Sequence, residues 1–181
     1  MNKKAPVRHT RMDLVEASIS DPPLARRMVA EQRDLLTATA GCDENALHWV
    51  VIECQVDAVD LLLDVGFDVN CRNGSLQTPL MLACCVGCRD VVGRLIERGA
   101  DVLATDEFGE SALFPAVRGG YVEIVERLLV HGADPNQKNE IGQCLAEDVL
   151  PRKREALISL LEAHGYQDPY VEYYGGAGDG E

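Results

Sequence analysis

Apolar residues recur along the chain in short groups with helical spacing, and a similar group returns every 33 residues. The clearest group follows one helix face with Val91, Val92, Leu95 and Ile96. A helix with such an apolar face must bury it against a neighbouring element. The pattern therefore predicts pairs of short helices that pack on one another, with no β-sheet beyond short loop bridges.

Two further signals keep the same period. Glycine returns at 66, 99, 132 and 165, in each case where an apolar run ends and a helix C-terminus favours a left-handed residue. A second motif precedes the first three of these glycines by 21 residues. It contains Asn, Thr or Ser as a helix cap and then an apolar start: Asn45-Ala46-Leu47-His48, Thr78-Pro79-Leu80-Met81 and Ser111-Ala112-Leu113-Phe114.

A 33-residue period with a Thr-Pro-Leu-His type of helix start is the signature of ankyrin repeats, and residues 12–166 resemble that family. The resemblance implies an all-α, ankyrin-type helix-turn-helix solenoid with short hairpin-like loops. It implies one domain with five units, of which the first and last are atypical caps: 12–40, 41–73, 74–106, 107–139 and 140–166. Residues 1–11 are then a basic N-terminal arm and 167–181 an acidic Gly/Tyr-rich tail.

The register also assigns burial. We expect five helix pairs with core positions at Leu47, Trp49, Leu61, Leu62, Leu80, Leu82, Leu95, Leu113 and Leu128. Some positions depart from the family pattern, because Asp43 and Leu76 stand where it prefers glycine before the cap. Gly93 is expected on the outer face of a second helix, at a cost of about 1 kcal/mol relative to Ala.

Composition narrows the range of partners. Seventeen Lys and Arg against 30 Asp and Glu give a net charge of −13, which repels phosphate backbones and anionic lipid. No apolar stretch approaches the roughly 20 residues of a membrane span. The basic start leads into no apolar segment, so we expect no secretory signal and a cytoplasmic location. We therefore expect a monomer that binds another protein, without nucleic acid, membrane or cofactor.

The seven cysteines, at 42, 54, 71, 84, 85, 88 and 144, are expected to be free thiols, because no export signal precedes them. Cys85 and Cys88 form a C-x-x-C, but a zinc site needs about four ligands and no second C-x-x-C follows. Cys84 is interpreted as a small buried residue of its repeat. A metal or redox module built on these thiols stays open as an alternative.

No arrangement of residues predicts catalysis. None of the four histidines accompanies a Ser, Cys or Asp in a nucleophile pattern, and no phosphate-binding glycine loop occurs. His131 and His164 hold equivalent places before a glycine and are interpreted as solvated. The chain is therefore expected not to be an enzyme.

The resemblance implies a concave binding face made of the loop tips and the exposed side of the first helices. Ile52, Cys85 and Val86 are apolar at exposed helix positions, and Phe108 and Ile141 are apolar at adjacent loop tips. Isolated exposed apolar residues are also ordinary on protein surfaces, so these five need not form a binding site. A second alternative for the function is an acidic decoy that inhibits a nucleic-acid-binding protein. The candidate partner-binding residues are Glu44, Ile52, Glu53, Cys85, Val86, Glu107, Phe108, Glu110, Arg118 and Ile141.

Overall fold

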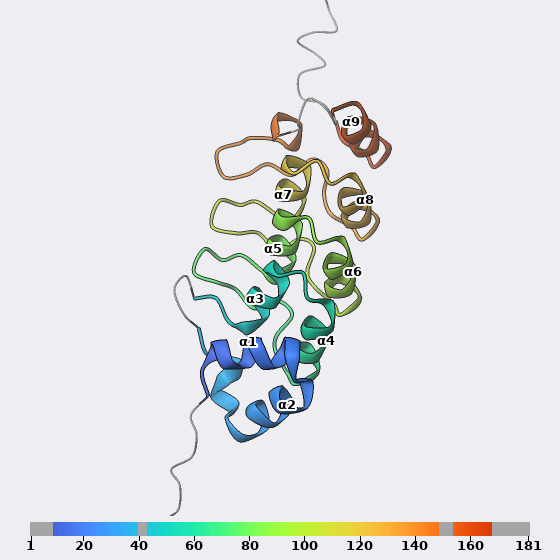
Figure 1. Ribbon diagram of the computed structural model, residues 1–181. Coiled ribbons are helices and arrows are strands. Elements are labelled where there is room, and N and C mark those ends of the chain that lie inside the picture. Colours follow the sequence, from blue (N-terminus) through green and yellow to red (C-terminus); the bar gives the residue numbers. More distant parts are fainter. Residues whose placement is uncertain (1–8, 40–42, 149–153, 168–181) are drawn as a thin grey trace, which may run out of the picture.

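The computed structural model describes residues 9–39, 43–148 and 154–167. Residues 1–8 of the expected arm and 168–181 of the expected tail lie outside the described residues, as do Cys42 and the Arg152-Lys153 pair. Within the described parts the chain is a succession of helix pairs and loops, with the first helices in one column and the second helices in another (Figure 1).

The helices follow one another without a long insertion. Short 3-10 helices, η1 and η2, accompany the α-helices of the first and last units. The elements are α1 (Arg11–Ser20), α2 (Pro22–Glu31), η1 (Arg33–Leu36), α3 (Ala46–Ile52), α4 (Val56–Asp64), α5 (Pro79–Val86), α6 (Arg89–Glu97), α7 (Leu113–Arg118), α8 (Val122–Val130), η2 (Leu145–Asp148) and α9 (Arg154–Ala163).

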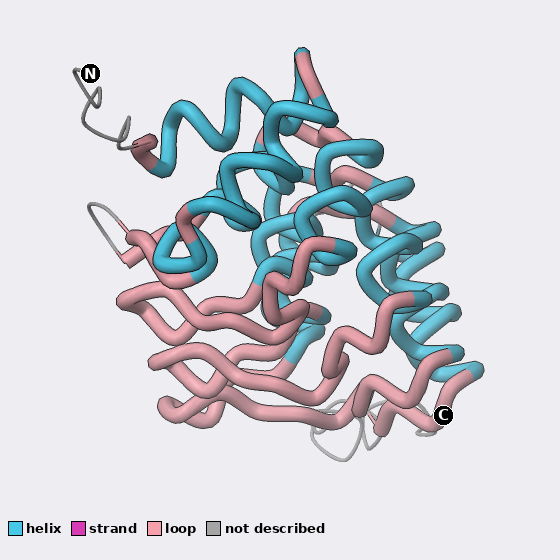
Figure 2. The backbone as a smooth tube through the Cα atoms, turned by 90° about the horizontal axis from the view of Figure 1, so that it is seen from below, coloured by secondary structure: helices cyan, strands magenta, loops and turns pink. Residues whose placement is uncertain are grey.

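No strand occurs in the described ranges, where two isolated bridges, Thr105–Ser111 and Lys138–Cys144, join the legs of two loops. These loops lie together on one side of the helices (Figure 2). The prediction of an all-helical solenoid with hairpin-like loops is therefore confirmed. No described helix has the length and apolar character needed to cross a membrane.

The predicted helix caps explain where the first helices begin. The Asn45 side-chain oxygen accepts from the backbone N–H groups of Leu47 and His48, at 3.0 and 3.2 Å. Thr78 does the same for Met81 at 3.4 Å, with Pro79 in the first turn, where its missing N–H is harmless. These caps satisfy amides that a helix start leaves without partners.

The last unit departs from the expected five α-helix pairs. Among its described residues the first helix is only the 3-10 turn η2, and α9 then packs against α8. Cys144 stands where the earlier units have Asn45, Thr78 and Ser111. A thiol is a weaker hydrogen-bond acceptor than an amide or hydroxyl oxygen, so this start has a poor cap.

The core is a continuous layer between the two helix columns. Leu47, Leu80 and Leu113 are fully buried there, as expected, and so are Leu61, Leu62, Leu95 and Leu128 from the second helices. The expectation for Trp49 and Leu82 is wrong, because both are only partly buried. Each lies two residues beyond a core leucine, about 200° further around its helix, and so faces away from the second helices.

Gly93 is buried, and the Arg127 guanidinium from α8 lies where its Cβ would be. The expectation that Gly93 is exposed is therefore wrong, because the missing side chain leaves the space that Arg127 of the next repeat fills. Gly66, Gly99, Gly132 and Gly165 all have left-handed φ, from 87° to 111°, as the period predicted.

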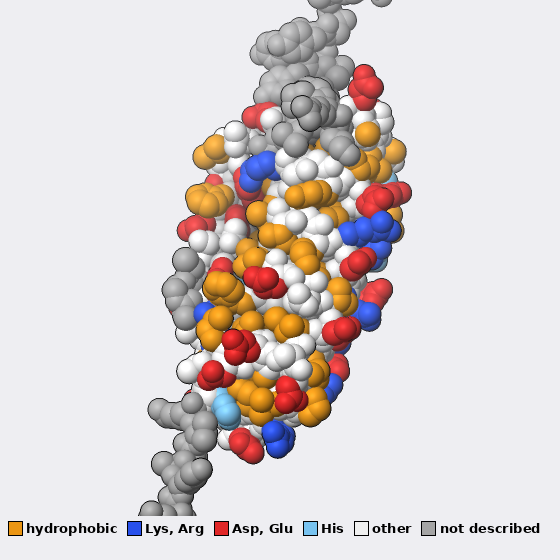
Figure 3. All heavy atoms as spheres, viewed as in Figure 1, with side chains coloured by type: hydrophobic (Ala, Val, Ile, Leu, Met, Phe, Trp, Pro, Cys, Tyr) orange, Lys and Arg blue, Asp and Glu red, His pale blue; other side chains and the backbone are white. Residues whose placement is uncertain are grey.

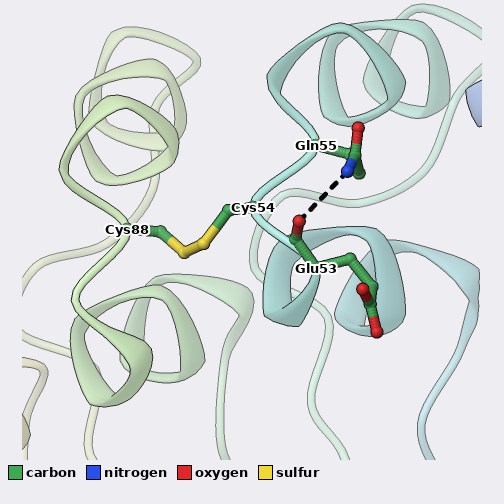
Figure 4. Close-up of a disulfide and its surroundings, with 4 residues drawn as sticks. All are labelled: Glu53, Cys54, Gln55 and Cys88. Atoms are coloured by element: carbon green, nitrogen blue, oxygen red, sulfur yellow. Dashed lines mark hydrogen bonds between the residues drawn. A yellow bond between two sulfur atoms is a disulfide. The ribbon is translucent and has the colours of Figure 1, made fainter.

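The expectation of free thiols is wrong for two cysteines, since Cys54 and Cys88 form a disulfide (Figure 4). It joins the turn after α3 to the turn after α5, with 5.6 Å between the two Cα atoms. The same geometry recurs one repeat later, where the Tyr121 ring covers Gly87. Stacking therefore brings each residue after a turn over the turn of the preceding repeat, which cysteine counting cannot reveal.

Candidate protein interface

Each central loop ends in a tight turn built around one side chain. Asp106 accepts from the backbone N–H groups of Phe108 and Glu110, at 2.9 and 3.0 Å. Asn73 holds Ser75 and Gln77 in the same way, at 3.1 and 2.9 Å. Side-chain acceptors of this kind fix turn geometry without neighbouring secondary structure. The tips are therefore defined by their own sequences.

Backbone hydrogen bonds also connect one tip to the next. The Glu107 N–H donates to the Ser75 carbonyl at 3.1 Å, and the Glu140 N–H donates to the Phe108 carbonyl at 2.9 Å. Three successive tips are thus tied into one row. A residue on this row projects from a backbone that is held on both sides.

The exposed side chains of these tips are apolar. Leu76 is 45% exposed, Phe108 60% and Ile141 79%. We call these three residues the tip row. Sequence reasoning found Phe108 and Ile141 but treated Leu76 only as a departure from the family pattern. The available signal was a bulky apolar residue at a position that prefers glycine, where Leu76 indeed has a left-handed φ of 60°.

A second apolar group lies at the C-terminal ends of α3 and α5. Cys85 is exposed, Val86 is 41% exposed and Ile52 is partly buried. We call Ile52, Cys85 and Val86 the helix-end patch. One repeat after Cys85 stands Arg118, whose guanidinium donates to the Glu110 carboxylate at 3.0 and 3.2 Å. This pair shows that the end of a first helix lies beside the loop of its own repeat. Figure 3 shows apolar side chains on the surface of both the loops and the first helices.

Carboxylates surround the two apolar groups. Glu53, Glu107 and Glu140 are exposed and form no ion pair with any residue in the described ranges. Glu110 is half-buried beneath Arg118, and Glu44 is half-buried with its backbone carbonyl accepting from Arg11 at 3.1 Å. All ten candidate residues therefore occupy the loop side or the ends of the first helices, with Glu110 and Arg118 bound to each other.

One thiol lies near a histidine, with 3.9 Å between Cys71 Sγ and His48 Nε2. Burial raises the pKa of the Cys71 thiol to about 11 and lowers the pKa of His48 below its ordinary value of 6.5. Both shifts favour the neutral forms, the reverse of what a reactive thiolate–imidazolium pair requires. His48 instead accepts from the Asn45 N–H at 3.2 Å and completes the cap of α3.

Other hollows lie on the outer side, along α6 and α8. Three neighbouring open depressions have volumes of about 370 to 480 Å³. Arg89 and Glu123 line two of them, and Arg127 lines the second of these and the third. They mix cations with carboxylates and contain no nucleophile beside a base. No group of three or more possible metal ligands lies together in the part of the chain that the structure describes.

The repeat geometry agrees with the comparison to known families. A family model described as ankyrin repeats in three copies matches residues 14–106 and residues 76–139. The chain belongs to the ankyrin repeat family. Ankyrin repeats are protein-interaction modules, and the family is generally non-enzymatic.

A similar protein is named as the probable E3 ubiquitin-protein ligase XBOS33 from Oryza sativa subsp. japonica. It is 38% identical over 85 residues, which are 46% of this chain and only 16% of the rice protein. The chain therefore spans a small part of that relative, and the likeness carries the repeats rather than the activity in its name.

Proposed function

We propose that this ankyrin repeat protein is a non-enzymatic scaffold that binds another protein through the tip row and the helix-end patch. The observation that carries the proposal is the tip row, in which Leu76, Phe108 and Ile141 project into solvent from loops that are hydrogen-bonded to one another. The part of an apolar side chain that stays in contact with water contributes no hydrophobic free energy to folding. Such side chains contribute to binding when a partner covers them.

The held backbone strengthens this argument. Ordering a flexible loop on binding costs free energy, and a loop that is already ordered avoids that cost. The Phe108 N–H donates a hydrogen bond to the Asp106 carboxylate, and the Phe108 carbonyl accepts one from the Glu140 N–H. Aromatic anchors in such settings often dominate the binding energy of an interface.

The test compares Phe108→Ala and Ile141→Ala with Val130→Ala, which removes an equally exposed side chain, 67% exposed, at the end of α8 on the other helix column. All three variants should unfold within about ±0.5 kcal/mol of the wild type, as surface changes usually do. The first two should weaken a partner captured from the native cell extract by more than about 1 kcal/mol, or fivefold. Denaturant melts and titrations measure both quantities.

If Phe108→Ala and Ile141→Ala bind as the wild type does, the proposed face is wrong and the outer side of α6 and α8 becomes the better candidate. If either change collapses the fold, the register of that loop is wrong. Val130→Ala should leave both readouts unchanged in every case that supports the proposal.

The net charge of −13 supports a second candidate, an acidic decoy that occupies the site of a nucleic-acid-binding protein. Such a complex depends on many screened charge contacts and little on apolar anchors. Its affinity should fall steeply with salt, because screening acts within about 8 Å at physiological ionic strength. It should also be indifferent to Phe108→Ala, which separates the two functions.

We further propose a monomer in the cytoplasm, where most of the thiols stay reduced. Cys71, Cys84, Cys85 and Cys144 are free, but the Cys54–Cys88 disulfide is unusual in a reducing compartment. Alkylation of thiols at the moment of cell lysis tests the proposal. A fully oxidised Cys54–Cys88 pair in cells would contradict the cytoplasmic location.

A further inference from the structure

The outer side of the second helices and the loop side differ in how many of their carboxylates form ion pairs. On the outer side, several carboxylates pair with arginines of neighbouring repeats, although Asp57, Asp90 and Glu126 form no ion pair with a described residue. Asp60 contacts Arg94 and Arg98 at 3.2 and 3.1 Å, and Asp64 contacts Arg98 at 2.9 Å. Arg89 pairs with Glu123 in the same way between α6 and α8. Figure 3 shows blue and red side chains interleaved along the right-hand edge, on the side of the second helices.

On the loop side fewer of the carboxylates pair with arginines, and the carboxylates without a partner lie beside exposed apolar side chains. Glu53, Glu107 and Glu140 make no ion pair within the described ranges, as noted above. The arginines there are already engaged, since Arg118 binds Glu110 and Arg72 donates to the Thr105 carbonyl at 2.9 Å. Lys138, on a leg of the last described loop, is exposed and forms no ion pair with a described residue. One lysine leaves the negative charge beside the tip row in excess.

We propose that the partner presents an extended segment that carries apolar side chains three residues apart, with Lys or Arg side chains between them. This inference rests on the proposed function and names the chemistry of the partner. Its apolar side chains would cover Leu76, Phe108 and Ile141, and its cations would reach the unpaired carboxylates of Glu53, Glu107 and Glu140. A guanidinium or ammonium group compensates a carboxylate that an acidic or neutral segment would leave unpaired.

The spacing of the tips favours an extended segment. Successive repeats stack at the packing distance of neighbouring helices, about 10 Å. An extended chain in the polyproline II conformation has three residues per turn and rises about 3.1 Å per residue, so every third side chain returns to the same face at about the distance of the next tip. The segment therefore places apolar residues three apart along the tip row, with cations between them.

The experiment selects binders from a phage-displayed library of random peptides of about a dozen residues, which extend to roughly 40 Å. The bait is the full 181-residue protein. We expect the selected peptides to be enriched in Lys and Arg together with large apolar residues three apart. Synthetic copies are then titrated against the wild type and against variants.

Two triple variants remove the same charge from opposite sides. Glu53→Gln/Glu107→Gln/Glu140→Gln changes the loop side, and the matched control Asp57→Asn/Asp90→Asn/Glu126→Gln changes exposed carboxylates of α4, α6 and α8 that have no ion-pair partner among the described residues. The first should weaken selected peptides at least about threefold, since an exposed pair contributes roughly 0.2–1 kcal/mol. The control should leave the affinity unchanged, and thermal melts confirm that both variants are folded.

The outcomes separate this inference from the proposed function. Selected peptides that are acidic or uncharged, yet lose affinity with Phe108→Ala, overturn the inference and leave the binding face standing. A selection without enrichment, or equal effects of the two triple variants, also overturns it. Peptides that ignore both the loop-side triple variant and Phe108→Ala overturn the inference and the proposed face together.

Discussion

Within the described ranges, three residues other than glycine adopt left-handed backbone angles, and each stands in a repeat turn. They are Asp43, Cys54 and Leu76, with φ of 57°, 55° and 60°. In later repeats the position of Leu76 is held by Gly109 and Gly142, both with positive φ. A side chain with a Cβ costs roughly 1–2 kcal/mol there. Glycine would avoid this free-energy cost at position 76, so the proposed binding role of the leucine side chain would explain why a leucine stands there.

Leu76→Gly tests that use. The variant should be more stable than the wild type by about 1 kcal/mol, because glycine adopts the left-handed angles without a clash. It should also weaken the partner by removing one member of the tip row. Leu76→Ala is the control, since it removes the same side chain but keeps the strained backbone. A glycine variant no more stable than the alanine variant would show that φ carries no strain at this position.

His48 predicts how stability depends on pH. Burial lowers its pKa in the folded state below 6.5, so the unfolded chain binds the proton more readily. Stability is therefore full above about pH 6.5, the unfolded value, and declines as pH falls below it toward the folded pKa. His48→Met should remove this part of the decline, because Met81 accepts from the Thr78 N–H at 3.4 Å in the equivalent cap.

Urea melts of the wild type and of His48→Met between pH 5 and pH 8 provide the measurement. The wild type and His48→Met both retain the exposed His131 and His164, so a difference between their two pH profiles comes from position 48. Parallel stability curves for the two proteins across this range would mean that His48 does not carry the dependence.

At the scale of single residues, register predicts burial well and orientation less well. The leucines of the core and the exposed Phe108 and Ile141 were placed correctly from the 33-residue period. Trp49 and Leu82 were not, because a repeat period says which positions are equivalent but not how far a short helix is rotated. Arg11 of α1 covers the Trp49 side chain, with its guanidinium 5.0 Å from the centre of the ring. This contact was hard to predict, because α1 belongs to the atypical first unit, where the repeat pattern is weak.

At the scale of elements, the disulfide links two helix pairs that otherwise meet through packing. It joins residues separated by 34 positions, and a loop of that size corresponds to about 4 kcal/mol of stability in the chain-entropy account. A reductant should therefore lower the urea midpoint of the wild type by roughly 1–2 M at ordinary denaturant slopes. The Cys88→Ser variant should have the lower midpoint with or without reductant.

Cys85→Ser is the matched control, because Cys85 is exposed and free and lies in the same repeat. It should keep the full response to reductant. Equal midpoints for the oxidised and reduced wild type would mean that the bond adds nothing to stability. The helix pairs of this region were predictable from apolar spacing, whereas the bond required the offset between stacked turns, which appears only in three dimensions.

At the scale of the whole molecule, the main contacts between units in the described ranges join neighbours along the stack: α3 with α5, α5 with α7, α4 with α6, and α6 with α8. Such a solenoid has no central core whose loss unfolds everything at once. The period made this architecture predictable from sequence. The strength of each junction was not, since it depends on local features such as the cap that Cys144 fails to provide.

The final unit should therefore open before the rest of the molecule. It lies at the end of the described stack, where α9 packs against α8 and η2 packs against α7, and its first helix is one 3-10 turn. Native-state hydrogen exchange should show lower protection for the amides of α9 than for those of α6, because local opening breaks one junction instead of two.

Leu161→Ala and Leu95→Ala sharpen this test, because both leucines are fully buried and stand two repeats apart at the same position of their units. Each truncation should cost roughly 2–5 kcal/mol locally. Leu161→Ala should remove protection from α9 and leave α5 and α6 as they are. Leu95→Ala should lower protection in α4, α6 and α8 together, since its unit contributes to the junctions on both sides. Uniform loss of protection from Leu161→Ala would show that the five units unfold as one cooperative block, and the nearest-neighbour account of this molecule would then be wrong.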